Sequence, residues 1–486
     1  MIDYRAITEQ CDADLRSGQA GKAIEALRRL SIPKVPREFR LPLANLCRRS
    51  GLWTVGLHLL MHIVRGEKEL GEPASPNELA EYAVLLMKGG AVGEAMDILS
   101  GVDDTFVGEA PMYRAFCEMA LWNYSEAIGH LQLYLRRHPK SYQSLIARVN
   151  LASCLVWVGQ TREAERFLDE LIQEADATNA LRLKANCLEL RGQVKLHTGD
   201  LTACAEDLKD ARRILDAQNL DLLLVRKWEA ILTAIKSGSA EPLAAFRKEA
   251  LKKQQWESLR DCDFHTLKLK FDDRLFHKLV CGTPYESYRK KTCALLGREM
   301  PEGLFDFGAG DPVLDMRTGQ ASNGAHVKVG QKVHQMLQIL LRDFYKPVSL
   351  GAIHGTLFAG EYFNIYSSPG RIHQILSRTR QYFSDHLVPA EVLALDSGYM
   401  LRLNGPFSFR LGVDRTANSG PQAQIEKLRE LLVLDRRELQ EFNSREVSRI
   451  LKISEPSARR LLRWGVSHNR LDLKGAGPAT KYKLAS

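Results

Sequence analysis

The chain has 486 residues, and its 45% hydrophobic and 26% charged residues are typical of a soluble globular protein with three or four domains. Residues 1–15 include acids where a signal peptide needs an apolar core, and no apolar run reaches the ~18–20 residues of a membrane helix. We therefore expect a cytoplasmic protein with no membrane partner.

The net charge of +9 is concentrated in the last third of the chain. Residues 1–330 sum to zero, residues 331–486 carry the whole excess, and residues 443–486 alone hold +7. This distribution indicates a neutral scaffold joined to an anion-binding end, although a basic end also occurs as a feature that only aids solubility.

From the N-terminus onward, one spacing pattern recurs every 32 to 40 residues. A small residue is followed seven positions later by glycine (tryptophan in one unit), five later by a second small residue and four later by leucine. The units are Cys11/Gly18/Ala23, Ala44/Gly51/Gly56, Ala83/Gly90/Ala95, Ala115/Trp122/Ala127, Ala152/Gly159/Ala164 and Gly192/Gly199/Cys204, and the leucines are Leu27, Leu60, Leu99, Leu131, Leu168 and Leu208.

This spacing predicts pairs of antiparallel helices. The small residues let two helices cross closely, the glycine ends the first helix with a positive φ, and the leucine fills the groove toward the next pair. A single pair cannot bury its apolar face, so the pairs must stack.

The pattern resembles the tetratricopeptide repeat over residues 5–217, with a weaker seventh pair to about Trp256. Pro139 stands where that family places its helix-ending proline. The resemblance implies a concave face that holds a protein or peptide partner, and repeat arrays often pair, so a homodimer is also considered. A generic helical array is the alternative.

Two groups of potential metal ligands lie in these repeats. His58 and His62 are four residues apart on one face of a predicted helix, but a metal site needs further converging ligands. We interpret both as ordinary helix residues. The nine cysteines form no CxxC pair and are expected to be buried thiols, and they are Cys11, Cys47, Cys117, Cys154, Cys187, Cys204, Cys262, Cys281 and Cys293.

Residues 257–302 are predicted to form a helical linker. The basic stretch at residues 288–291 is either a solvated helix end or a phosphate contact. From residue 303 to 329 the sequence alternates apolar and polar residues between turn signals, which predicts two to four short antiparallel strands.

Three helices and a hairpin are predicted next. The helices cover residues 332–344, 349–358 and 367–383, and the third begins with serine caps and Pro369. Its inward residues are Ile372, Leu376, Thr379 and Phe383. The hairpin runs from Glu391 to Leu403.

This order of elements resembles the OmpR/PhoB-type winged helix, in which the third helix enters the major groove and the hairpin follows the minor groove. Gly398-Tyr399 matches the Gly-Tyr that ends the family's wing, but Leu395 and Asp396 replace its usual arginine and glycine. The resemblance implies DNA contacts from Arg371, Gln374, Ser377, Arg378, Arg380 and Gln381. A guanidinium pairs with guanine or with phosphate, and the alternative for Arg380 is an acid inside the domain.

Residues 421–486 follow a helix-turn-helix plan with a second wing, and resemble bacterial winged helices. Asn443 or Ser444 caps a first helix with Val447, Ile450 and Leu451 facing inward. The predicted DNA contacts are Ser454, Ser457, Arg459, Arg460, Arg463, Lys474, Thr480 and Lys481. The alternative is a winged helix that contacts protein.

The sequence thus predicts a mainly α chain with a tetratricopeptide-like solenoid at 1–256, a linker at 257–302, and two α+β winged helices at 303–413 and 421–486. We expect a transcription regulator that binds double-stranded DNA in the bacterial nucleoid. The alternative is a non-enzymatic scaffold or adaptor.

An enzyme is disfavoured, because the sequence has no P-loop, dinucleotide fingerprint or nucleophile motif. The Gly-Ala-Gly at residues 308–310 lacks the helix that a dinucleotide site needs. We predict no catalytic residue, no metal and no cofactor.

Overall fold

The computed structural model describes residues 3–16, 19–66, 72–138, 142–412, 425, 428–429, 431–433, 441–451, 455–467, 470–475 and 480–485. The chain divides into two compact units. Unit 1 consists of Met1–Ile98, Glu302–Asp343 and Pro347–Ser486, and unit 2 consists of Leu99–Pro301 and Phe344–Lys346.

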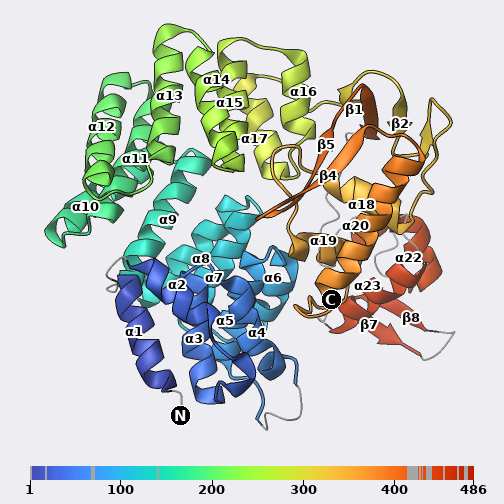
Figure 1. Cartoon of the computed structure of the whole chain (residues 1–486), viewed down its shortest axis with the longest axis horizontal. Coiled ribbons are helices and arrows are strands. Elements are labelled where there is room, and N and C mark those ends of the chain that lie inside the picture. Colours follow the sequence, from blue (N-terminus) through green and yellow to red (C-terminus); the bar gives the residue numbers. More distant parts are fainter. Residues whose placement is uncertain are drawn as a thin grey trace. The chain divides into compact units, whose positions relative to one another are not determined.

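Consecutive helices form hairpins through both units (Figure 1). The first three pairs are α1 (Tyr4–Arg16) with α2 (Ala20–Arg28), α3 (Arg37–Arg49) with α4 (Trp53–Val64), and α5 (Pro76–Lys88) with α6 (Val92–Ser100). Unit 2 continues with α7 (Ala110–Ala120), α8 (Tyr124–Arg137), α9 (Tyr142–Val158), α10 (Thr161–Ala177), α11 (Leu181–Thr198), α12 (Leu201–Ala217), α13 (Leu223–Ser237), α14 (Glu241–Lys252), α15 (Trp256–Leu269), α16 (Asp273–Cys281) and α17 (Glu286–Leu296).

The spacing pattern is confirmed wherever its residues are described. The small residues at the helix crossings are buried, and the six leucines have at most 1% of their surface exposed. Four of the helix-ending glycines have φ between +79° and +86°, namely Gly51, Gly90, Gly159 and Gly199. Gly18 and Pro139 lie outside the described residues. The chain therefore contains tetratricopeptide-like helical repeats.

Trp122 stands where the other units have glycine, and it adopts the same backbone conformation, with φ of +65°. This conformation costs a side-chain-bearing residue roughly 1–2 kcal/mol. Contacts from α17 hold it, because the Ser287 hydroxyl donates to the Trp122 carbonyl at 2.7 Å and the Tyr285 ring stacks on the indole at 5.4 Å between centroids.

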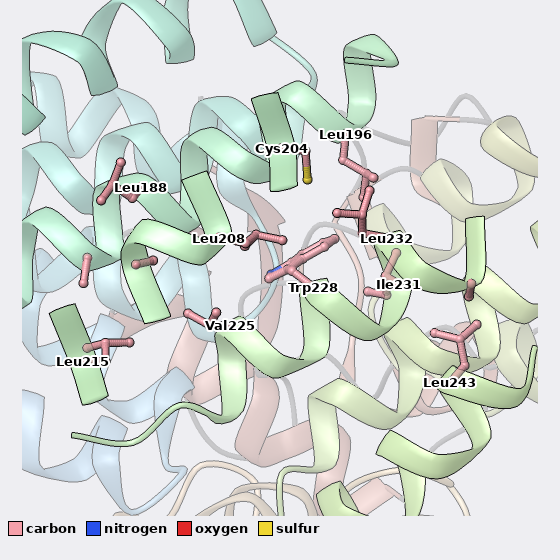
Figure 2. Packing of buried hydrophobic residues seen from close by; sticks show 13 residues of the cluster. Leu188, Leu196, Cys204, Leu208, Leu215, Val225, Trp228, Ile231, Leu232 and Leu243 are labelled. Atoms are coloured by element: carbon pink, nitrogen blue, oxygen red, sulfur yellow. The ribbon is translucent and has the colours of Figure 1, made fainter. Parts of the chain in front are cut away.

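The array continues beyond the six strong units. Gly238, with φ of +66°, ends α13 before α14, which forms the seventh pair. Figure 2 shows Leu208 from α12 and Trp228 from α13 in one buried cluster with residues of α11 and α14. The helices between residues 257 and 302 share a core with α14, since Phe276 and Leu279 pack with Phe246.

The tripeptide Phe344–Lys346 belongs to unit 2, although it follows a helix of unit 1. Tyr345 is 1% exposed, and its hydroxyl donates to the Asp263 carboxylate at 2.6 Å. The backbone N–H of Phe344 donates to the Gly282 carbonyl at 2.9 Å. A short stretch of the C-terminal region is thus built into the core of the repeats.

The region from residue 302 to 412 contains a four-stranded sheet, with three strands at the start of the region and one at its end. Its strands are β1 (Leu304–Ala309), β2 (Val313–Asp315), β3 (Gln320–Ala321) and β6 (Phe407–Gly412), in the order β1-β6-β2-β3. β6 was not predicted, and it lies antiparallel to β1 but parallel to β2. The three strands found between residues 303 and 329 alternate in direction, as predicted, and the distant strand β6, with buried Phe407 and Phe409, separates β1 from β2.

The three predicted helices and the hairpin are present between these strands. They are α18 (Lys332–Leu340), α19 (Leu350–Leu357), α20 (Ser368–Asp385), β4 (Ala390–Leu395) and β5 (Gly398–Leu403). Gly398 has φ of +143°, and a Cβ there would lie 2.2 Å from the Val348 carbonyl oxygen. Only glycine allows the hairpin to pair this closely with the segment before α19, where Tyr399 bridges to Val348.

The last described part contains α22 (Ser444–Leu451), α23 (Glu455–Ser467), β7 (Leu471–Lys474) and β8 (Lys481–Leu484). The backbone of Phe442 pairs with Tyr482 of β8. These elements share a small core that includes Val447, Leu461 and Leu462. Among the helices that the structure describes, none has the length and apolarity of a membrane span.

Candidate nucleic-acid interface

The start of α20 is fixed by Asn364 rather than by a serine cap. The Asn364 side-chain oxygen accepts the backbone N–H groups of Tyr366 and Ser367 at 2.9 and 3.1 Å. Ser368 accepts the N–H of Asn364 at 3.0 Å, and Ser367 makes no capping bond. The predicted serine caps are therefore wrong, because the asparagine organises the turn instead.

The two faces of α20 are those that the sequence predicted. The inward residues Ile372, Leu376, Thr379 and Phe383 are all buried. The six predicted contact residues are all exposed, and they are Arg371, Gln374, Ser377, Arg378, Arg380 and Gln381. The helix is held by its apolar face and presents a continuous polar face to solvent.

Three residues at the centre of this face are unengaged. Within the described chain, no hydrogen bond or ion pair involves the side chain of Gln374, Ser377 or Arg378. Their donors and acceptors are therefore available to an external partner, and the guanidinium of Arg378 offers five N–H groups.

The other three contact residues have partners inside the chain. Arg371 pairs with Glu361 at 2.6 Å, and Gln381 donates to Asp385 at 2.6 Å. Arg380 donates to the Val392 carbonyl of β4 at 3.1 Å. The expected internal partner of Arg380 is thus a wing carbonyl and not an acid, which ties the helix to the hairpin.

The hairpin formed by β4 and β5, which was predicted as a wing, has no unpaired positive charge among the described residues at its tip. Its turn holds the exposed Asp396, and Arg402 is paired with Glu391. His373 on the exposed face of α20 hydrogen-bonds the Tyr399 hydroxyl at 2.8 Å. The sequence analysis did not select His373, although its position between Arg371 and Gln374 places it on the same face.

In the last domain, the described arginines of α23 lie on its surface. The Arg459 side chain is 63% exposed and pairs with Glu455 at 2.6 Å, while Arg463 is exposed and donates to the Arg459 carbonyl. Ser454 and the side chains of Ser457 and Arg460 lie outside the described residues.

The second wing brings two predicted contacts onto one acid. Lys474 and Lys481 pair with the two oxygens of Glu441 at 2.6 and 3.3 Å. The bonds that both lysines donate hold the pKa of Glu441 below its usual value. Part of the positive charge of this wing is therefore neutralised by Glu441, while Thr480 lies half-buried beside β8.

The basic stretch at residues 288–291 is used in part for packing against the repeats. Tyr288 is 3% exposed, and Lys291 donates to the Trp157 carbonyl with its ammonium 4.0 Å from the indole centroid. Burial lowers the pKa of Lys291 to about 8. Lys290 pairs with Glu286 at 2.7 Å. Packing of α17 against the repeats uses these groups.

The repeats of unit 2 contain one described hollow, of about 500 Å³, between α12 and α13. Its charged lining residues are Lys209, Arg212, Glu229 and Lys236, and Arg212 pairs with Glu229 at 2.8 Å. All nine cysteines are buried free thiols, as predicted. In the described residues, no cluster of His, Cys, Asp and Glu fits a metal ion.

No family model and no curated protein matches the sequence. Solved structures similar to parts of the chain include a Rap protein complexed with competence and sporulation factor, at 12% identity over 60% of this chain and 86% of that one, with a TM-score of 0.39. Others are the TPR-like repeats of a putative kinesin light chain from Podosopora anserina (17% identity, 45% and 99% covered, TM-score 0.28) and a tetratricopeptide repeat protein from Parabacteroides merdae (17%, 57% and 96%, 0.33). These similarities are weak, and the repeat fold is evident from the helix pairs themselves.

Proposed function

We propose that this chain is a DNA-binding transcription regulator. In this proposal two winged helices, at residues 303–412 and 441–485, contact double-stranded DNA. They bind this DNA in the bacterial nucleoid. The repeats bind a protein or peptide partner or join two copies of the chain.

The observation that carries the proposal is the outer face of α20. A helix fits the major groove of B-DNA, which is about 12 Å wide, and base edges there are read by amide, hydroxyl and guanidinium groups. Gln374, Ser377 and Arg378 offer those groups side by side with no internal partner. Because Arg380 is fixed to β4, the helix and the wing approach the duplex as one rigid body.

The second domain adds sequence-independent affinity in this proposal. Arg459, Arg463, Lys474 and Lys481 are exposed on α23 and on the wing, where phosphate contacts are expected. Contacts to several phosphates make binding fall steeply with salt, with a slope of about 0.9 per phosphate in log Kd against log salt.

The decisive variant is Arg378→Ala, which removes the one unpaired guanidinium at the centre of the α20 face. We expect affinity for DNA fragments captured from the genome to fall about tenfold, since a base contact contributes roughly 1–3 kcal/mol. Arg29→Ala is the matched control, because Arg29 is 77% exposed on α2 and pairs only with its neighbour Glu25 in the described chain. Its affinity should equal that of the wild type.

Equal binding by Arg378→Ala and the wild type would mean that α20 does not read DNA. Genome-wide capture of bound fragments separates the regulator from the scaffold or adaptor. Enrichment at promoters supports the regulator, and no enrichment at any locus supports the adaptor, which would use the same surfaces for protein contacts.

A further inference from the structure

Helices α4 and α6 of unit 1 hold the segment that leads into α20. The N–H of Gly351, in the first turn of α19, donates to the Gly89 carbonyl at 3.1 Å. A Cβ on Gly351 would lie 2.5 Å from the backbone nitrogen of Ala91, and one on Gly90 would lie 1.8 Å from the Ser349 hydroxyl. The turn between α5 and α6 and the start of α19 therefore meet backbone to backbone.

Residues 361–367 of the loop between α19 and α20 are held by a half-buried acid of α6. Glu94 accepts the backbone N–H of Phe363 at 2.7 Å, and Phe363 is 1% exposed. Arg65 pairs with the other carboxylate oxygen, and its guanidinium lies 4.4 Å from the Tyr362 ring centroid. Separating the loop from α6 would leave one oxygen of the Glu94 carboxylate and the Phe363 N–H without each other, which makes the contact specific.

The two histidines of α4 complete the contact. The His58 ring stacks on Tyr366 with 4.7 Å between centroids, and His62 Nε2 lies 3.2 Å from the Tyr366 hydroxyl. Their spacing of four residues places both on the face of α4 that meets the loop. Both histidines were interpreted as ordinary helix residues, and the structure gives them one partner, Tyr366, which is 304 residues from His62 and 308 from His58.

The last domain is attached to the same helix. The Trp464 indole N–H of α23 donates to Asp97 at 3.2 Å. Asp97 follows Glu94 by three residues, so both acids lie on one side of α6. One helix of the repeats thus contacts both candidate DNA-binding domains.

This attachment uses groups that DNA binding also needs. In helix-turn-helix proteins the helix before the recognition helix crosses the DNA backbone, and N–H groups at helix starts bind phosphates. Here Gly351 is buried, and its N–H is already bonded to Gly89. Glu361 of the same loop holds Arg371 at the start of α20.

We propose that α4 and α6 form an internal docking surface that restrains DNA binding by both C-terminal domains, and that release from this surface raises DNA affinity. The docked state keeps the N–H of Gly351 at the start of α19 bonded to Gly89, and the released state exposes this N–H to phosphate. This inference rests on the proposed DNA-binding function.

The test opens the docking surface from the repeat side, where no residue belongs to the candidate DNA interface. In His58→Ala with His62→Ala, hydrogen exchange of residues 349–366 should become at least tenfold faster, measured by mass spectrometry on the full chain. DNA affinity should rise at least threefold. His130→Ala on α8, a half-buried histidine of unit 2, is the matched control and should change neither quantity.

Tyr366→Ala opens the same contact from the loop side, and its ring is 55% exposed, so the fold should tolerate the change. Faster exchange with unchanged or weaker DNA binding would overturn the restraint. Unchanged exchange in both variants would overturn the docking surface. Faster exchange in a chain that binds no DNA in any form would refute the proposed function, and the restraint with it, while supporting the docking surface itself.

Discussion

The repeats and the C-terminal region differ in how far apart in sequence their contacts are. In the repeats, most contacts join neighbouring helices, and a glycine ends the first helix in most of the described units. In the C-terminal region, Arg410 of β6 pairs with Asp306 of β1 across 104 residues, and Phe363 bonds Glu94 across 269. Local contacts leave a periodic trace in the sequence, whereas distant contacts leave none.

The two regions also use their charges differently. In unit 2, Arg191 forms a bidentate pair with Asp207 and also binds Asp169, so its charge is satisfied within the repeats. On α20, Arg378 has no such partner within the described chain. The net charge of a region therefore indicates a site for an anion only after the cations that already have an acidic partner are subtracted.

The largest expected effect lies in the repeats, where Leu208 fills the cluster shown in Figure 2 and is 1% exposed. Leu208→Ala should lower the free energy of unfolding by roughly 2–5 kcal/mol, through lost burial and the cavity left behind. Denaturant unfolding of the full chain measures it. Leu224→Ala, at a leucine that is 51% exposed, is the control and should stay within about 0.5 kcal/mol of the wild type. Similar losses in both variants would contradict the assigned core.

A smaller effect is expected at the wing. Gly398→Ala combines a left-handed φ with a Cβ 2.2 Å from the Val348 carbonyl oxygen, and it should cost about 1–3 kcal/mol of stability.

Gly129→Ala is expected to change stability in the opposite direction. Its Cβ would meet nothing within 4 Å in the middle of α8, so stability should rise by about 0.5–1 kcal/mol. Thermal or denaturant unfolding tests both, and a neutral Gly398→Ala would show that the wing does not need this close approach.

The last expected effect concerns how the free energy of unfolding depends on pH, through Glu94 at the docking surface. Burial raises the pKa of Glu94 to about 7, against an ordinary value of 4.5. A group whose pKa is raised in the folded state stabilises that state fully below its unfolded pKa and less as the pH rises, so the contribution of Glu94 to stability should decline between pH 4.5 and 7. The groups that face it are Arg65, Asp97, Tyr82, Tyr362 and the N–H of Phe363.

Glu94→Gln isolates this contribution, because glutamine still accepts the Phe363 N–H but does not titrate. Unfolding free energies of the two proteins are compared from pH 4.5 to 7.5, and the value for the wild type minus the value for Glu94→Gln should fall steadily as the pH rises. Parallel curves would mean that Glu94 does not titrate there, and that the docking surface is independent of its ionisation.

The sequence predicted the repeats nearly residue by residue, because helix crossings and turns impose the same residue types at the same spacing in each unit. The pattern also placed Trp122 at the glycine position of its unit, but it did not reveal that Ser287 of α17 and the preceding Tyr285 hold the left-handed backbone of Trp122. It also predicted the inner and outer faces of α20, since helical periodicity alone separates Ile372 from Arg378.

For the candidate interface, the sequence predicted which residues lie on the surface but not which of their side chains already have a partner within the chain. Whether Arg371, Arg380 or Lys474 is already paired depends on Glu361, Val392 and Glu441, and no local pattern links these partners. DNA contact by the fourteen predicted residues stays a prediction, as do the domain boundaries at 256, 302, 413 and 421.

The sequence by itself determined the helix pairs and the amphipathic faces, because both follow from periodic contacts within a few turns of the chain. Tertiary structure decided the place of β6 between β1 and β2, the burial of Tyr345 in the repeats, and the contact of His58 and Glu94 with the loop before α20. These features join segments that are 82 to 308 residues apart, where only the folded chain brings the partners together.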